Sequence, residues 1–580
     1  MNGVRVALAL LLLCRTALAA AGLSVDVKIT GVSGPLLNNV KAYLSIERQK
    51  SDRALTQFEL ERLHKRAPDE INAALQPFGY YHPKIAASLT SVDGRWVAHY
   101  DVDPGPPVRI SKVEIRLKGG GVKDPEFQAQ IGKFPLSQGD VLNQPLYEQG
   151  KQNFQRYATD FGYFDFKWQT SEIMVDRDTN SAVITLIADT GQRYQFGEIR
   201  FHQHSLRPAL VRRFLPFHTG QPYEAAALLK LQNALLDSNY FQNVDINPRR
   251  NEAQDHKIPI DITLTPRPRQ LYSFGAGYGT DTGPRAKVGW EDRRVNSLGH
   301  RFDTEYKTSQ ILDSLTARYI IPIKDPRTEQ FAITSSWLHD HPEVSNSDTY
   351  LFGVSRSVGR GNNWLETIYL NYQTEQYSVA GETGKTRMLM PGITWTKIVA
   401  DNRIYPERGL YLQLDVRGAH PDLLSNVQFL QVQGQGKFIH RLFDNTRLQL
   451  RGQIGATRFG AIRTLPVSVR FFAGGDQSVR GYAYQSLGPR NAAGQVIGGE
   501  QLLVGSVELE QSFTHGWSGA IFYDAGNAMS SWQESLEKGA GFGVHWLSPI
   551  GPVRVDVGLP LSEPRPFHHP RLYLNIGPDL

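Results

Sequence analysis

The sequence contains very little cysteine and, beyond its first residues, no long apolar run. Its single cysteine, Cys14, lies in the opening segment, which excludes disulfides and cysteine metal sites from the rest of the chain. After Leu13, no segment approaches the ~20 consecutive apolar residues that a transmembrane helix needs. The formal net charge of +6 includes no basic run, which argues against a nucleic-acid partner.

The opening residues predict a secretory signal peptide over residues 1–19. Arg5 supplies the positive start, Val6–Leu13 the apolar run, and Ala17–Ala19 a small-residue cleavage site. Leu13 stands before Cys14 at a position where a lipoprotein signal has a small residue, so lipidation is not expected. The chain is therefore expected to be exported, either as a soluble periplasmic protein or as an outer-membrane barrel.

The first half carries a pattern that recurs over residues 23–106, 107–190 and 191–266. Each copy begins with a short strand, continues through helical stretches to an aromatic corner, and ends in paired strands. The corners are Phe78–Tyr81, Phe161–Phe164 and Ser238–Phe241. Their second residue is glycine twice and asparagine once, the residues that best tolerate a left-handed helix end. Each copy is therefore predicted to be β-α-α-β-β, a small sheet covered by helices on one face.

Residues 267–580 change to short alternating segments joined by polar loops. In Thr446–Gly455, for example, Leu448 and Leu450 fall on one face, and Arg447 and Arg451 on the other. Such alternation, with aromatic residues near strand ends, predicts a transmembrane β-barrel of about sixteen strands. A soluble propeller or β-sandwich is the alternative. The predicted fold class is thus α+β repeats followed by an all-β 16-stranded transmembrane barrel.

The stretch 471–482 stands out within the predicted barrel. Gly475 and Gly481 permit a tight fold-back, and Arg480 between them offers a two-pronged hydrogen bond to a carboxylate. Two carboxylates have the parity to face the same interior. Glu508 and Asp524 both alternate with apolar residues, and they lie on neighbouring predicted strands. Glu510 shares this parity.

These segments resemble the hallmark motifs of the BamA superfamily, and the repeated units resemble its periplasmic POTRA domains. Gly139 and Gly220, each before a second helix, match the POTRA pattern. The resemblance implies that Arg480 tucks into the barrel and meets Asp524 and Glu508 there, whereas Glu510 has no counterpart. The loop latch that it implies consists of Gly475, Val479, Arg480, Gly481, Tyr482, Glu508, Asp524 and Gly526.

The first and last barrel strands, about 271–279 and 572–577, are predicted to form a weak seam. Glycines weaken a strand because they pack nothing and lose more entropy on folding. By resemblance, this seam is a lateral gate that opens into the outer-membrane lipid and exposes a strand edge to a client. The predicted seam residues are Gly275, Gly277, Gly279, Leu572, Leu574, Ile576 and Gly577.

Three POTRA units and an ending, Ile576–Leu580, without a terminal aromatic residue resemble the TamA family. These proteins are the outer-membrane subunits of the translocation and assembly module. The resemblance implies autotransporters and other outer-membrane proteins as clients. It also implies a TamB-like, inner-membrane-anchored partner that spans the periplasm. POTRA domains are expected to receive clients or partners by strand addition to an exposed sheet edge.

Other chemistries find little support in the sequence. Gly275–Gly279 is not followed by the helix that a nucleotide loop requires. His339, His341 and the pair His568–His569 lack further placed ligands, and no nucleophile–base set emerges, so no metal, cofactor or enzymatic activity is expected. The alternatives that remain are a two-partner-secretion transporter with one dedicated substrate, and a passive porin or ligand receptor.

Overall fold

The structure is a computed structural model that describes residues 23–93, 95–402, 405–459, 465–514, 516–548 and 551–576. The predicted signal peptide over residues 1–19 and the predicted seam residue Gly577 lie outside these residues. The chain divides into two compact units, one drawn mainly from residues up to 200 and the other mainly from residues after 260. Among the described residues, no helix is both long enough and apolar enough to cross a bilayer.

The described residues before the barrel form three small sheets with one strand order. In each sheet the last strand of the unit is central, between the first and the second. The three sheets are β1 (Ser24–Thr30), β3 (Arg95–Asp103) and β2 (Lys84–Val92); β4 (Arg109–Lys118), β6 (Ser181–Asp189) and β5 (Lys167–Asp176); β7 (Gln195–His202), β9 (Lys257–Pro266) and β8 (Phe241–Pro248).

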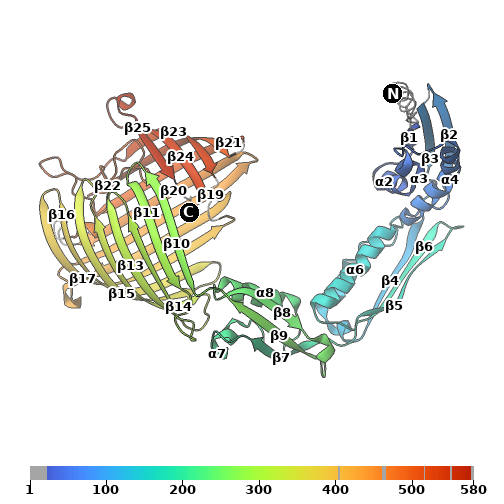
Figure 1. Ribbon diagram of the computed structural model, residues 1–580, viewed down its shortest axis with the longest axis horizontal. Helices are drawn as coiled ribbons and strands as arrows, with labels where there is room; N and C mark the ends of the chain where they lie inside the picture. The colour runs from blue at the N-terminus through green and yellow to red at the C-terminus, as the bar shows by residue number, and fades with distance from the viewer. Residues whose placement is uncertain are drawn as a thin grey trace, which may run out of the picture. The chain divides into compact units, whose positions relative to one another are not determined.

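Helices follow the first strand of each unit, which gives the predicted β-α-α-β-β order (Figure 1). These helices are α2 (Gly34–Tyr43), α3 (Ser45–Gln49), α4 (Gln57–Leu75), η1 (Gln76–Phe78), η2 (Gly120–Lys123), α5 (Pro125–Gly132), α6 (Gln144–Asp160), α7 (Pro208–Val211), η3 (Arg212–Phe214) and α8 (Ala225–Asp237), whereas the short η4 (Arg250–Glu252) lies between β8 and β9. In the first unit, α4 begins with a capping box, in which Thr56 and Glu59 bond each other's main-chain N–H groups. Its Leu63 and Ile71 then pack into the core that Tyr100 of β3 completes.

The aromatic corners join each unit to the next part of the chain. Gly79 and Gly162 have φ angles of 82°, and Asn239 has 63°, so all three adopt the left-handed conformation that the sequence predicts. At Gly79 and Gly162 the carbonyl oxygen accepts a hydrogen bond from the first residues of the following unit, Val108 at 2.7 Å and Tyr194 at 2.9 Å. At the third corner, Tyr240, the residue after Asn239, has the same role.

The third corner also contacts the barrel. The carbonyl oxygen of Tyr240 accepts from the main-chain N–H of Arg267 at 2.9 Å, and its hydroxyl donates to the carbonyl oxygen of Gly299 at 2.5 Å. Leu210 of α7 packs against the same glycine, where an added Cβ would lie 2.4 Å from its side chain. The aromatic corner, which recurs three times in the sequence, therefore joins its unit to the next part of the chain in all three cases.

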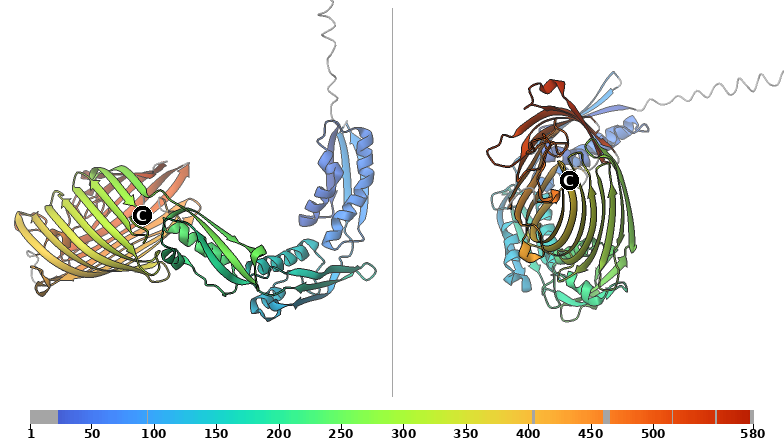
Figure 2. Two further views of the ribbon diagram at one scale, coloured as in Figure 1. Left: turned by 60° about the horizontal axis from the view of Figure 1, so that its bottom comes forward. Right: turned by 90° about the vertical axis from the view of Figure 1, so that its left-hand side faces the viewer.

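The described residues after this junction form a closed antiparallel barrel of sixteen strands, as predicted (Figures 1 and 2). Its strands are β10 (Gln270–Gly279), β11 (Gly283–Asp292), β12 (Arg301–Thr308), β13 (Leu312–Pro322), β14 (Glu329–Asp340), β15 (Ser345–Gly359), β16 (Trp364–Val379), β17 (Glu382–Ala400), β18 (Arg408–Ala419), β19 (Phe429–Phe443), β20 (Thr446–Phe459), β21 (Gln501–Thr514), β22 (Trp517–Met529), β23 (Glu537–Ser548), β24 (Gly551–Pro560) and β25 (Arg571–Ile576).

The barrel wall separates an apolar outer face from a charged inner face. On β22, Ile521 and Tyr523 are exposed on the outside, whereas Phe522 and Asp524 are buried on the inside. Phe274 of β10 is 77% exposed on the outer face. Because strand side chains alternate with a period of two, this division follows directly from the alternating sequence.

The closure between β10 and β25 differs from the rest of the wall. β10 pairs with β11 at ten positions, whereas the described residues of β10 and β25 pair at one, Gly279 with Asn575. The Thr280 main-chain N–H adds a bond to the Leu574 carbonyl oxygen at 3.1 Å, and the Leu574 N–H donates to the Thr280 hydroxyl at 2.8 Å. The backbone ladder that closes the barrel is therefore short.

The corner geometry predicts that Gly79→Ala opens the first junction. An added Cβ would lie 2.8 Å from the Leu142 carbonyl oxygen, and a non-glycine residue at this φ costs on the order of 1–3 kcal/mol. We expect faster amide hydrogen exchange over residues 76–81 of the full-length protein. Gly132→Ala is the control, because that glycine has no neighbouring atom within 4 Å of an added Cβ. Equal exchange in the two variants would contradict the prediction.

Candidate functional site

The loop between β20 and β21, described from residue 465 to residue 500, packs against the inner wall of the barrel. Its Phe471, Val479 and Tyr482 form one buried cluster with Val504 of β21 and Ala528 of β22. Burying one aliphatic side chain contributes about 1.5–3 kcal/mol, so this cluster alone gives the loop a defined position.

Two glycines let the loop approach its neighbours closely. Gly475 and Gly481 have φ angles of 101° and 104°, in the region that favours glycine. A Cβ on Gly481 would lie 2.7 Å from the carbonyl carbon of Leu559 on β24, and one on Gly475 would lie 2.5 Å from a carboxylate oxygen of Asp281. Side chains at these two positions would push the loop away from the wall.

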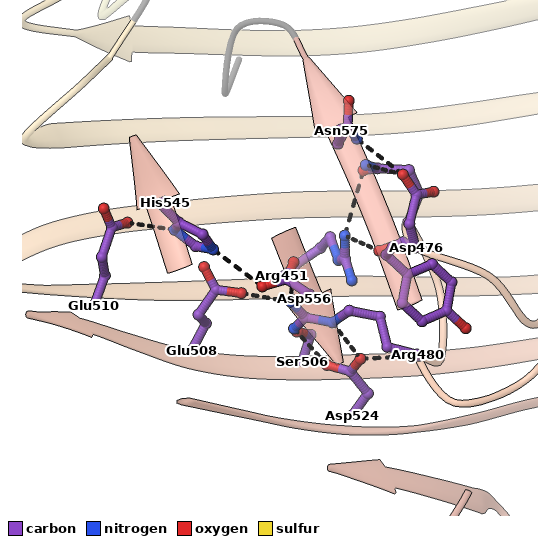
Figure 3. Close-up of polar contacts among 12 residues, drawn as sticks. Arg451, Asp476, Arg480, Ser506, Glu508, Glu510, Asp524, His545, Asp556 and Asn575 are labelled. Carbon is purple, nitrogen blue, oxygen red and sulfur yellow. Dashed lines mark hydrogen bonds and ion pairs between the residues drawn. The ribbon is translucent and has the colours of Figure 1, made fainter. Parts of the chain in front are cut away.

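The Arg480 guanidinium lies between these glycines and binds two carboxylates on neighbouring strands (Figure 3). Its Nε and Nη2 donate to the two oxygens of Asp524 at 2.8 and 3.0 Å, and its Nη1 donates to Glu508 Oε2 at 2.6 Å. The Arg480 main-chain N–H donates to Asp524 as well, at 3.0 Å. Ser506 of β21 accepts a further bond, at 3.3 Å.

This ion-pair cluster is shielded from solvent. Arg480 and Glu508 are each 4% exposed and Asp524 is fully buried. Asp556 of β24 adds a third carboxylate at 3.6 Å from Nη1, and the Phe522 ring lies 3.4 Å from the guanidinium carbon. Removing one partner of such a cluster leaves a buried charge uncompensated. The resulting loss of folding stability is larger than the stabilisation that a surface ion pair provides.

A second arginine binds the main chain of the same loop. Arg451 of β20 donates from Nη1 to the Asp476 carbonyl oxygen at 3.2 Å, and from Nη2 to the Ser478 carbonyl oxygen at 3.4 Å. The alternation of Thr446–Gly455 placed Arg451 on the polar face, but carbonyl acceptors carry no sequence signal. This loop anchor was therefore missing from the predicted latch.

Glu510 binds a further set of buried side chains. It accepts from Arg447 of β20, from the Tyr405 hydroxyl at 2.8 Å and from the Ser518 hydroxyl at 2.5 Å. His545 of β23 lies between this set and the ion-pair cluster, 3.5 Å from Glu510 and 3.1 Å from Asp556. Glu510 is therefore connected to Arg480 through His545 and Asp556.

Glu508, Glu510 and His545 also place three potential metal-ligating atoms within 4.8 Å of one another. Each carboxylate already binds an arginine, Glu508 through Arg480 and Glu510 through Arg447. Because these cations already compensate the two charges, the donor set does not fit a metal ion, and we assign none.

The loop is bonded to the last strand. The Gly481 main-chain N–H donates to the Tyr573 hydroxyl at 2.9 Å, and that hydroxyl donates to the Tyr482 carbonyl oxygen at 2.8 Å. Tyr573 is buried on the inner face of β25, opposite in parity to Leu572 and Leu574. Tyr573 was missing from the predicted latch, although its hydroxyl bonds the loop main chain on both sides of the Gly481–Tyr482 peptide.

The loop is also bonded to the turn between β10 and β11, across the seam. The Asp476 main-chain N–H donates to Asp281 in that turn at 2.6 Å. The Asp476 carboxylate accepts from the Asn575 side chain of β25 at 2.8 Å (Figure 3). The loop therefore connects the two strands that share the short backbone ladder.

The remaining predicted residues fall at two places. Gly526 lies on β22 opposite Val504, beside the loop cluster, and β22 continues beyond it to Met529. At the seam, Gly279 pairs with Asn575, and the other described seam residues lie on the same two strands, Gly275 and Gly277 on β10 and Leu572, Leu574 and Ile576 on β25.

The barrel with its apolar outer face, the inward loop and the preceding α+β units define a class of protein, a transmembrane β-barrel with soluble repeats in front of it. Residues 298–579, which include most of the barrel, match the Omp85 superfamily domain. Residues 26–104 match the first POTRA domain of TamA, and residues 194–267 match a POTRA domain described as a surface antigen variable number repeat. The protein is thus an outer-membrane β-barrel with periplasmic POTRA domains.

Curated relatives are assembly factors. The chain is 22% identical over 434 residues to the outer membrane protein assembly factor BamA of Nitratidesulfovibrio vulgaris, covering 70% of this chain and 54% of that protein. It is 22% identical over 480 residues to BamA of Neisseria meningitidis, covering 70% and 60%. The chain thus spans a little over half the length of these relatives. The crystal structure of BamA from Haemophilus ducreyi lacking POTRA domains 1–3 aligns with a TM-score of 0.67 at 16% identity, over 81% of this chain and 99% of that one.

The shared burial of Arg480 and Asp524 predicts non-additive losses. Arg480→Ala leaves the buried carboxylates of Asp524 and Glu508 without their cation, and Asp524→Ala removes the bidentate partner of Arg480. We expect each substitution to lower the free energy of unfolding in detergent by about 3–5 kcal/mol. The double variant should lose less than the sum, because the bond between the two residues can be lost only once. Arg490→Ala is the control, since this exposed loop arginine bonds carbonyl oxygens of its own loop. Simple additivity would contradict the pairing.

Asp281 predicts a pH dependence of the contact between loop and turn. Burial raises the pKa of this carboxyl from 3.8 to about 7; the hydrogen bond from the Asp476 main-chain N–H opposes the rise, and the Asp476 carboxylate adds to it. The folded protein therefore holds this proton more tightly than the unfolded chain, so the contribution of Asp281 to stability is greatest below pH ~4 and is lost as the pH rises to ~7. We expect Asp281→Asn to flatten the fall in melting temperature across this interval. If the melting temperature of Asp281→Asn depends on pH as that of the wild-type protein does, Asp281 is not the group responsible for the fall.

Proposed function

We propose that this protein assembles client β-barrel proteins into the outer membrane, or translocates them across it, through a lateral gate between β10 and β25. The observation that carries the proposal is the seam, where the described residues make one backbone pair, Gly279 with Asn575. The names of its curated relatives, outer membrane protein assembly factors, support the same activity.

The physical basis of the gate is the low cost of opening it. Each backbone hydrogen bond contributes about 0.5–1.5 kcal/mol net, so a ladder with one residue pair opens far more easily than its neighbours. β24 and β25 pair at six positions, from Val553–Ile576 to Gly558–Arg571, so β25 would move with β24 when the seam opens. The freed edge of β10 would offer its N–H and C=O groups to an incoming strand.

The POTRA sheets provide further exposed edges. Because the last strand is central in each sheet, the first and second strands lie at the edges. β2, for example, pairs with β3 on one side, and most of its residues are exposed. An extended client or partner segment would add to such an edge through main-chain bonds, which place few demands on its sequence.

We infer a TamA-type role in preference to a BamA-type role. The match of residues 26–104 to the first POTRA domain of TamA and the three sheets before the barrel support it. On this proposal the clients include autotransporters, and the partner is a TamB-like protein anchored in the inner membrane. A passive porin fits less well, since the loop of Val479 and Arg480 packs inside the barrel.

A disulfide across the seam tests the gate. Tyr278 and Ile576 flank the Gly279–Asn575 pair on its outer face, so Tyr278→Cys with Ile576→Cys, in a Cys14→Ser background, should lock the strands together. We expect the oxidised protein to lose most of its ability to assemble an autotransporter β-barrel, and reductant to restore it.

The matched control is a disulfide within the continuous wall, Leu450→Cys with Val507→Cys, which joins paired residues of β20 and β21. It should leave assembly unchanged. Full client assembly by the seam-locked protein would refute the lateral gate.

A further inference from the structure

A side chain from β11 crosses β10 and reaches the last strand. Arg285 pairs with Gly277 in the β10–β11 ladder, and its guanidinium extends over that glycine. Its Nη2 donates to the Ile576 carbonyl oxygen at 2.6 Å and to the Asn575 side-chain oxygen at 3.0 Å. The main chain of β25 is therefore held partly by an arginine two strands away.

The absence of a side chain at Gly277 makes this crossing possible. A Cβ there would lie 2.8 Å from Arg285 Nε and 3.2 Å from the Ile576 carbonyl oxygen, closer than carbon packs. Gly275 lies two residues earlier on the same face, and its Cβ would meet Lys287 Cβ at an ordinary 3.7 Å. Gly275 and Gly277 have similar sequence contexts, but the path of the Arg285 side chain requires the absence of a Cβ only at Gly277.

The space beside this crossing is large enough for more than a water molecule. A cavity of about 550 Å³ is lined by Gly275 and Gly277 of β10, Arg285 of β11 and Ile576 of β25. Lys287 and Lys307, which also line it, both pair with Glu305. Arg285 instead points at the seam, where its bonded atoms are a carbonyl and an amide oxygen.

We propose that Arg285, in the gap over Gly277, is a positioning residue that binds a main-chain carbonyl of whichever strand occupies the edge of β10. That strand is β25 in the closed barrel and an extended client strand during assembly, so the inference rests on the proposed function. A main-chain carbonyl is present in every strand, so this recognition sets register and does not select sequence. Hydrogen bonds to a charged donor are the strong ones, which suits a seam with a short ladder.

The first test measures seam closure. The disulfide yield between Tyr278→Cys and Ile576→Cys, in a Cys14→Ser background, reports how often the strands are paired. Losing a hydrogen bond to a charged group should lower this yield about tenfold or more in Arg285→Ala. Gly277→Ala, which displaces the guanidinium, should behave alike, and Gly275→Ala should match the parent. Heat-modifiable migration on gels confirms that each variant has a folded barrel.

The second test separates recognition from simple closure. The probe is a biotinylated peptide with the sequence of residues 571–576 and a photoreactive phenylalanine analogue in place of Leu572. Full-length protein in detergent is irradiated with it, and crosslinks to β10 are quantified by mass spectrometry. If Arg285 binds the carbonyl of any strand, Arg285→Ala and Gly277→Ala capture about tenfold less peptide than Gly275→Ala does.

The opposite result would overturn the inference. A residue that merely clamps β25 would leave the β10 edge freer when removed, so equal or greater peptide capture by Arg285→Ala refutes recognition. Absence of capture by the wild-type protein refutes it too. A wild-type protein that captures the peptide through Arg285 and yet assembles no client would refute the proposed function and leave this inference standing.

Discussion

The bidentate ion pair between Arg480 and Asp524 is the interaction on which the barrel interior depends. A guanidinium that is 4% exposed must be compensated within the protein, and Asp524 and Glu508 on adjacent strands provide this compensation. Because the pair holds the loop against the wall, the neighbouring Gly481 reaches Tyr573 of the last strand. The position of one buried charge therefore determines where the loop meets the seam.

At the seam between β10 and β25, side-chain hydrogen bonds take the place of much of the backbone pairing. Its described ladder is one residue pair long, yet Arg285, Tyr573 and Asp476 all bond across it or to the loop that spans it. Side-chain bonds can break one at a time, whereas a long ladder opens cooperatively at a higher total cost. Such a closure is stable at rest and still able to release the edge of β10, which is what the proposed assembly activity requires.

Much of this architecture could be predicted because it depends on local periodicity. Alternation with a period of two assigned Glu508 and Asp524 to the inner face of neighbouring strands, and the glycines at the corners indicated their left-handed backbone. The same alternation placed Arg451 on the polar face of its strand. It could not name the partners of Arg451, because parity gives the side of a strand and says nothing about the segment that packs there.

The sequence by itself determined the strand faces, the repeated units and the residue types of the buried latch, since each follows from the order of neighbouring residues. Only the tertiary structure decided that Arg285 reaches Ile576 and that Asp281 meets Asp476, pairs that lie 291 and 195 residues apart. Both contacts exist because a closed barrel brings its first and last strands together, and because a buried charge fixes one loop at that junction. Contacts that form only when the barrel closes and the loop is buried produce no periodic pattern in the sequence.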